Sequence, residues 1–119
     1  MTLSKKHQSV LKTILIFQTL ALLVYTSFAV KSEGWTLFQV LINNITALKW
    51  NGQFNLDFSC YLLLSGIWIV WRNKFSGSSF IIASIAMIIG IIAFAPYLLY
   101  LIIKENGDLK KVLLGKQLN

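Results

Sequence analysis

The stretch Phe80–Ile103 (FIIASIAMIIGIIAFAPYLLYLII) decides how this chain must fold, because it contains no charged residue. At about 1.5 Å of rise per residue, a continuous helix over it is roughly 36 Å long, enough to cross a hydrocarbon layer of about 30 Å. We therefore predict a membrane-spanning helix over residues 80–103. Pro96 lies in the last third of this helix and is expected to kink it, because proline lacks the backbone N–H.

The composition of the whole chain supports the same class. The 119 residues are 56% hydrophobic and only 13% charged, whereas soluble domains carry about 25% charged residues. We therefore predict an all-α integral membrane protein with a single membrane domain over residues 1–119. The net charge of +7 is divided among both termini and the loops and forms no basic face. This distribution favours membrane lipids over nucleic acid as partners.

Two further apolar stretches are expected to span the membrane, which gives three transmembrane helices in all. The first covers residues 13–30 and follows a basic amino terminus. Its alternative is a secretory signal peptide, with Ser-Phe-Ala at residues 27–29 as the cleavage site. The second covers residues 52–71, with Trp50 and Trp71 at its ends, as in the aromatic belts of membrane proteins.

The remaining segments are expected to lie at the membrane surface. Residues 35–48 show helical periodicity with one apolar face, but a helix of roughly 21 Å is too short to span. We expect a short interfacial or re-entrant amphipathic helix there, and a four-span protein in which it crosses is the alternative. The basic tail, residues 104–119, is expected to form a short surface helix.

Three alternating spans bring several polar residues to the same side of the membrane. We predict that this side holds a ligand-binding pocket, lined by Tyr25, Asp57, Tyr61, Tyr97 and Tyr100. The positive-inside rule does not orient this arrangement, because the cations are divided almost equally between the two sides. Of the eleven, one side holds Lys5, Lys6, Lys12, Arg72 and Lys74, and the other side holds the remaining six.

Asp57 is the candidate catalytic residue, because it is the one acid in an otherwise apolar stretch. A carboxylate at mid-bilayer costs about 2.5–3.5 kcal/mol on insertion scales, so it must lie near the interface, be paired or be protonated. The structural interpretation is a first-turn acid favoured by the helix dipole and paired with Lys49. The functional interpretation is a buried proton or ligand site that uses the tyrosines as hydrogen-bond partners.

Small residues recur at helical spacing along the third predicted span. Ala83, Ala86, Gly90 and Ala93 share one face, and small residues let helix backbones approach closely in lipid. We therefore expect this face to pack against other helices, either within the chain or in a homo- or hetero-oligomer. The alternative is that these residues simply face lipid.

Nothing in the sequence indicates a metal or a cofactor. Cys60 is the single cysteine and His7 the single histidine, so neither a disulfide framework nor a metal-ligand spacing is present. The chain also lacks the phosphate-binding glycine loops and the nucleophile motifs of soluble enzymes. We expect no cofactor and no metal, and a non-enzymatic protein in preference to an enzyme.

Three short motifs resemble a family of small bacterial multi-span membrane proteins that is catalogued only as a domain of unknown function. They are Asn43-Asn44, then Asn55-Leu56-Asp57 with Ser65 further along the same helix, and Phe94–Leu101 (FAPYLLYL). The resemblance covers roughly residues 10–105. It implies a small multi-helix fold in a bacterial cytoplasmic (inner) membrane, and it brings no known activity.

The sequence therefore predicts a non-enzymatic subunit, or a binder of lipid or of a small hydrophobic ligand. One alternative is a membrane-embedded enzyme that acts on a lipid or isoprenoid with Asp57 as general acid or base. The other is a component of an oligomeric transporter, because a single chain of three spans encloses no pathway.

Overall fold

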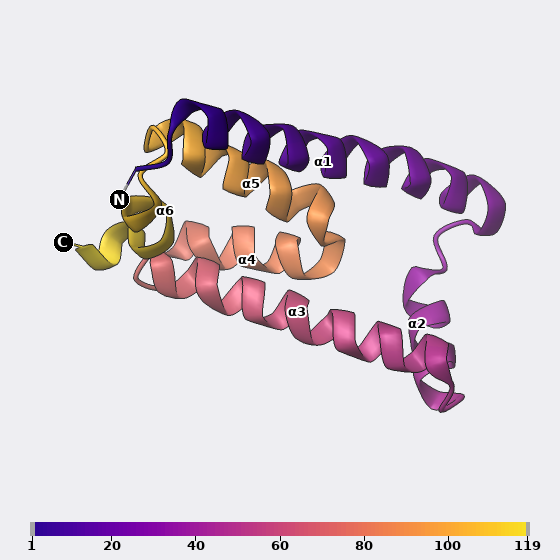
Figure 1. Ribbon diagram of the computed structural model, residues 1–119. Helices are drawn as coiled ribbons and strands as arrows, with labels where there is room; N and C mark the ends of the chain where they lie inside the picture. Colours follow the sequence, from indigo (N-terminus) through magenta and orange to yellow (C-terminus); the bar gives the residue numbers. More distant parts are fainter. Residues whose placement is uncertain (1, 119) are drawn as a thin grey trace.

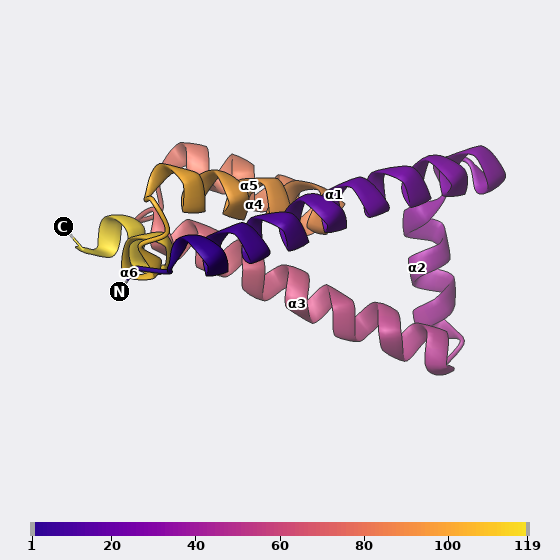
Figure 2. The same ribbon diagram turned by 45° about the horizontal axis from the view of Figure 1, so that its top comes forward.

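The computed structural model describes residues 2–118, and within them the protein is all-α, without strands. The helices, in chain order, are α1 (Lys5–Glu33), α2 (Leu37–Thr46), α3 (Trp50–Arg72), α4 (Gly77–Ile89), α5 (Ile91–Lys104) and α6 (Leu109–Leu114), followed by a 3₁₀ turn, η1 (Gly115–Leu118). The long helices α1 and α3 run in opposite directions, and α2 bridges their separated ends (Figures 1 and 2). We call this end the α2 end, and the opposite end, where both termini lie, the terminal end.

Two helices are long and apolar enough to cross a membrane, α1 with 29 residues and α3 with 23. The most apolar window of α1 is 6% buried and that of α3 is 11% buried. Most residues of both stretches are therefore not covered by other parts of the chain. Ser4 begins α1 by accepting a hydrogen bond from the backbone N–H of His7, and Gly34 ends it with a φ of 71°.

The prediction of one continuous helix over residues 80–103 is wrong. The chain instead forms a helical hairpin, α4 and α5, with its tip at Gly90 (Figure 1). Gly90 has a φ of 80° and a ψ of −135°, a conformation that only glycine adopts without strain. The chain therefore reverses direction half-way, and α5 brings it back to the terminal end. The structure has two candidate spanning helices where three were predicted.

Three other predictions concern Pro96, the four-span alternative and the tail. Pro96 lies inside α5, which continues through it, and the kink there stays a prediction. The four-span alternative is also not what the structure shows, because α2 has only ten residues and covers roughly 15 Å. The short helix predicted within the basic tail is found as α6, which follows the end of α5 and precedes η1.

The hairpin packs between α1 and α3 through two apolar clusters. One joins α5 to α1 and α6 and contains Leu15, Ala95, Leu101, Ile102 and Val112. The other joins α4 to α3 and contains Ile69, Val70, Ala83 and Ala86. Trp68 and Tyr97 contact both clusters and so connect them. All this packing lies in the half of the molecule near the termini.

Small residues permit the close approach of α3 and α4. Ala83 and Ala86 are buried against α3, so the structure places both on a packing face within the chain. Gly66 lies opposite them, and a Cβ built there would come 2.3 Å from the Met87 sulfur. Of the other two predicted packing residues, Gly90 forms the hairpin tip and Ala93 is half-buried on α5. Close helix contact through small residues is the expected means of packing in lipid.

Candidate functional site

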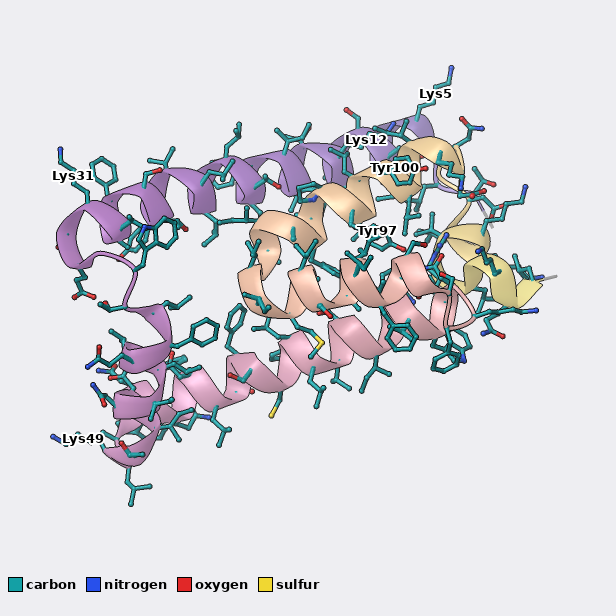
Figure 3. The ribbon with its side chains drawn as sticks, turned by 180° about the vertical axis from the view of Figure 1, so that it is seen from behind. Lys5, Lys12, Lys31, Lys49, Tyr97 and Tyr100 are labelled. Carbon is teal, nitrogen blue, oxygen red and sulfur yellow. The ribbon has the colours of Figure 1, made fainter. Side chains whose placement is uncertain are left out.

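The five residues predicted to line one pocket do not come together. Tyr25 lies near the α2 end of α1, and Asp57 and Tyr61 lie on α3. Tyr97 and Tyr100 lie on α5 at the terminal end, beside Lys12 and far from Lys31 and Lys49 (Figure 3). The Tyr97 hydroxyl accepts a hydrogen bond from the Asn73 side chain at 3.0 Å, next to the last residue of α3. The hairpin causes this separation, because it returns α5 to the end from which α4 began.

Asp57 is also not enclosed in a site. It is exposed on the surface of α3, seven residues from Trp50 at the start of that helix. Its carboxylate forms neither a hydrogen bond nor an ion pair with another residue in the range 2–118, and the predicted pair with Lys49 is not formed. Tyr25 and Tyr61 are similarly open, with 73% and 66% of their surfaces exposed. These three residues therefore offer a potential ligand no shared cavity.

A concave site lies between the hairpin tip and the α2 end, and we call it the central cavity. It has a volume of about 510 Å³ and is lined by five helices. Its walls comprise Leu22, Thr26, Leu37, Phe38, Leu41, Asn55, Phe58, Ser59, Leu62, Leu63, Met87, Ile88, Ile89, Ile91 and Ile92. A volume of this size lies within the range of about 300–1,000 Å³ that is usual for small-molecule sites.

The lining of the central cavity is apolar and contains no titratable side chain. Its polar members are Thr26, Asn55 and Ser59, and the Ser59 hydroxyl already donates to the backbone carbonyl of Asn55 at 2.7 Å. The described lining of the cavity therefore holds no acidic or basic side chain. Its chemistry suits a hydrocarbon chain or another apolar ligand, which gains by burying its surface among Leu, Ile and Phe side chains.

A second apolar hollow lies on the other side of the hairpin tip, with a volume of about 500 Å³. It shares Phe58, Leu62 and Ile91 with the central cavity, so the two are neighbours around the tip. Gly90 lines it, and a Cβ built on Gly90 would lie 3.3 Å from the Phe58 ring. Gly90, which has no side chain, therefore lets the hairpin tip lie close to α3. An apolar hollow lies on each side of the tip.

Positive charge is concentrated at the terminal end. Of the eleven lysines and arginines, Lys31 and Lys49 lie at the α2 end (Figure 3), and the other nine lie at or near the terminal end. Glu33 and Asp57 balance the two lysines of the α2 half, so the net charge of +7 belongs to the terminal end. Three spans would divide the lysines and arginines almost equally between the two ends of the molecule, and this expectation is wrong. The hairpin brings Lys104 and the lysines after it back to the terminal end.

No group of three His, Cys, Asp or Glu side chains that could hold a metal ion lies together within the described part of the chain. Cys60 is exposed on α3.

Comparisons of the chain with family models, with curated proteins and with solved structures gave no match. The resemblance to a family of small membrane proteins therefore stays a prediction.

The central cavity was missed at the level of sequence, although one signal for it was present. The apolar face expected for residues 35–48 supplies Leu37, Phe38 and Leu41 to its wall. The opposite wall, Met87 to Ile92, comes from both sides of the hairpin tip. That wall depends on the reversal at Gly90, which a search for continuous apolar length does not find.

Proposed function

We propose that this chain is a small integral membrane protein in which α1 and α3 cross the bilayer and the α4–α5 hairpin enters it from one side and returns. Trp50 and Trp71, at the two ends of α3, are roughly 32 Å apart along a straight helix, close to the thickness of a hydrocarbon core. Large apolar side chains on the outer faces of both long helices are exposed and need a non-aqueous surrounding.

The charge distribution supports a definite orientation. Cytoplasmic loops of membrane proteins carry an excess of lysine and arginine. The terminal end has nine of these residues and the α2 end has two, so both termini belong on the cytoplasmic side. A bacterial cytoplasmic membrane, which the family resemblance implies, is part of the same proposal.

Within the bilayer, the proposed function is to bind the acyl chain of a lipid or a similar hydrophobic molecule, without chemical conversion. The observation that carries this proposal is the central cavity, with its volume of about 510 Å³ and its apolar walls from five helices. It lies between the two proposed spans, where lipid chains are the abundant ligand. An enzyme that uses Asp57 gains no support, because Asp57 does not line the cavity.

Native mass spectrometry of the purified protein tests this function. Delipidated protein in mild detergent is mixed with a phosphatidylcholine, whose neutral headgroup limits binding to what the acyl chains contribute. We expect one retained lipid on the unaltered chain and its loss in Ile92→Trp, because the indole fills the cavity that Ile92 lines. The control Ile81→Trp places the same side chain on the outer face of α4, where Ile81 is 64% exposed, and should retain the lipid.

Equal lipid retention by the two tryptophan variants would contradict the proposal, because binding would then not depend on the cavity. Far-UV circular dichroism of each variant shows whether the helices persist. A loss of lipid in both variants, with unchanged helicity, would likewise place the lipid outside the central cavity.

A further inference from the structure

A second, chemically different pocket lies at the terminal end, where α3, α5, α6 and η1 meet. We call it the basic pocket. It has a volume of about 370 Å³ and is lined by Arg72, Asn73, Lys104, Glu105, Lys111, Gly115, Lys116 and Leu118. Four of these residues are cations and one is an acid. A concave site with such an excess of positive charge attracts anions.

Arg72 is held in place as the buried part of this pocket. It is 5% exposed, and its guanidinium donates to the backbone carbonyls of Lys111 and Val112 and to the side-chain oxygen of Asn73. All three acceptors are neutral, so none of them cancels the charge of the arginine. These bonds use three of the five N–H groups that a guanidinium carries. The charge of Arg72 is therefore fixed in position and remains available to a ligand.

The chain passes tightly over this arginine. A Cβ built on Gly115 would lie 2.8 Å from the central carbon of the Arg72 guanidinium, closer than ordinary contacts allow. Neighbouring bonds fix the same corner: the Trp68 indole N–H donates to the Leu113 carbonyl at 3.0 Å, and the Gln117 side chain donates to the Trp71 carbonyl at 2.7 Å. The pocket is thus pre-organised, and a ligand does not have to order Arg72 on binding.

Three exposed lysines complete the lining of the pocket: Lys104, Lys111 and Lys116. The Lys104 ammonium also lies over the Tyr100 ring, 5.9 Å from its centroid. One fixed guanidinium with several exposed ammonium groups around it suits a phosphate, which accepts hydrogen bonds through several oxygens. Among the described residues of the lining, Glu105 is the one carboxylate, so their side chains together carry a net positive charge.

We propose that the basic pocket binds a phosphate group, presented by the headgroup of an anionic phospholipid. The lipid source rests on the membrane placement proposed above, in which the terminal end lies at the cytoplasmic surface, where anionic headgroups are concentrated. The phosphate chemistry itself does not rest on it. This site is separate from the central cavity, because the two share no lining residue.

The test uses the full chain carrying Ile92→Trp, so that lipid in the central cavity does not contribute. The protein in mild detergent is titrated with phosphatidylglycerol, with phosphatidylcholine and with inorganic phosphate, and bound ligand is counted by native mass spectrometry. The double variant Lys104→Gln/Lys116→Gln removes two pocket cations. The matched control Lys6→Gln/Lys110→Gln removes two exposed lysines from the same end that do not line the pocket.

We expect phosphatidylglycerol to bind more tightly than phosphatidylcholine, and the pocket variant to weaken its affinity about 30-fold, because each exposed ion pair lost from the bound phosphate is worth up to roughly five-fold. The control variant should lose less than three-fold. Binding of inorganic phosphate with the same dependence on the two lysines, but no preference for phosphatidylglycerol, would keep the phosphate site and overturn the lipid source. Equal losses in both variants, or equal binding of the two lipids, would overturn the site itself.

Failure of this proposal and failure of the cavity proposal give different results. Phosphatidylcholine retention that depends on Ile92 but not on Lys104 reports the central cavity alone. Phosphatidylglycerol binding that persists in the Ile92→Trp chain and falls with Lys104 and Lys116 reports the basic pocket alone.

Discussion

The two ends of this molecule are held together by different forces. At the terminal end, hydrogen bonds join segments that are distant in sequence. The backbone N–H of Leu3 donates to the Gly107 carbonyl at 2.9 Å, and the Gln8 side chain donates to the carbonyls of Leu3 and Asn106. The Trp68, Arg72 and Gln117 side chains add bonds between α3 and the carboxyl-terminal segment. This end is polar, basic and cross-connected.

At the α2 end, the helices are held together by close packing. The helix α2 packs on the start of α3, where Gly52 is buried against its backbone. Large aromatic side chains remain open there, with Trp35 87% exposed and Trp50 78% exposed. The two ends therefore differ in the kind of contact that joins their segments: hydrogen bonds at the terminal end, and close packing of α2 on α3 at the α2 end.

The largest expected effect concerns which side of the membrane each end occupies. In a Cys60→Ser background, single cysteines at Lys6, Lys49 and Lys116 are exposed to a membrane-impermeant maleimide in right-side-out vesicles. We expect full labelling at Lys49, and labelling at Lys6 and Lys116 only after detergent is added, because the hairpin returns the carboxyl-terminal segment to the side of the amino terminus.

The alternative topology gives an opposite pattern in the same assay. If residues 80–103 crossed as one continuous helix, Lys116 would lie on the side of Lys49, and both would be labelled in intact vesicles. Joint labelling of Lys49 and Lys116 would therefore remove the distinction between the two ends on which the basic pocket depends.

The next effect tests whether packing alone holds the α2 end. A Cβ built on Gly52 would lie 2.2 Å from the backbone oxygen of Asn44, so Gly52→Leu must push α2 away from α3. Overpacking of this kind costs about 1–3 kcal/mol, and we expect a loss of free energy of unfolding in that range. Thermal unfolding in detergent micelles, followed by circular dichroism, measures it.

Gly77→Ala is the matched control for this substitution. Gly77 is the first residue of α4 at the terminal end, and a Cβ built there meets no atom within 4 Å. It should leave the stability unchanged or raise it slightly, since alanine favours helices more than glycine does. If Gly52→Leu were equally harmless, α2 would not be packed on α3 as the structure has it.

Much of the α2 end follows from the sequence. Apolar length predicts residues 13–30 and 52–71 as helices, and the structure extends them to Lys5–Glu33 and Trp50–Arg72. The periodicity over residues 35–48 predicts an amphipathic helix, found as Leu37–Thr46. These features are local, because each is encoded by the spacing of residues within one segment.

The terminal end does not follow in the same way. Residues 80–103 contain no charged residue, and glycine is common in membrane helices, so Gly90 by itself does not predict a reversal. The reversal is stabilised by contacts of the tip with Phe58 and Leu62 of α3, which a single segment does not reveal. Arg72 meets Lys111 and Lys116 only once the hairpin has formed. Neither the basic pocket nor the unequal distribution of charge between the two ends could therefore be predicted from the sequence.

The smallest expected effect is that of replacing Asp57, a charged residue of the α2 half that differs from Arg72 at the terminal end in its exposure and bonding. Asp57, on the α2-end half of α3, is exposed, whereas Arg72, at the other end of the same helix, is 5% exposed and bonds three acceptors. Asp57→Asn should therefore change the free energy of unfolding by less than about 0.5 kcal/mol, as is usual for surface substitutions. It should also leave lipid retention unchanged in native mass spectrometry, because Asp57 lines neither cavity. A loss of bound lipid at unchanged stability would show that the Asp57 carboxylate contributes to lipid binding. The binding site would then extend beyond the central cavity to Asp57.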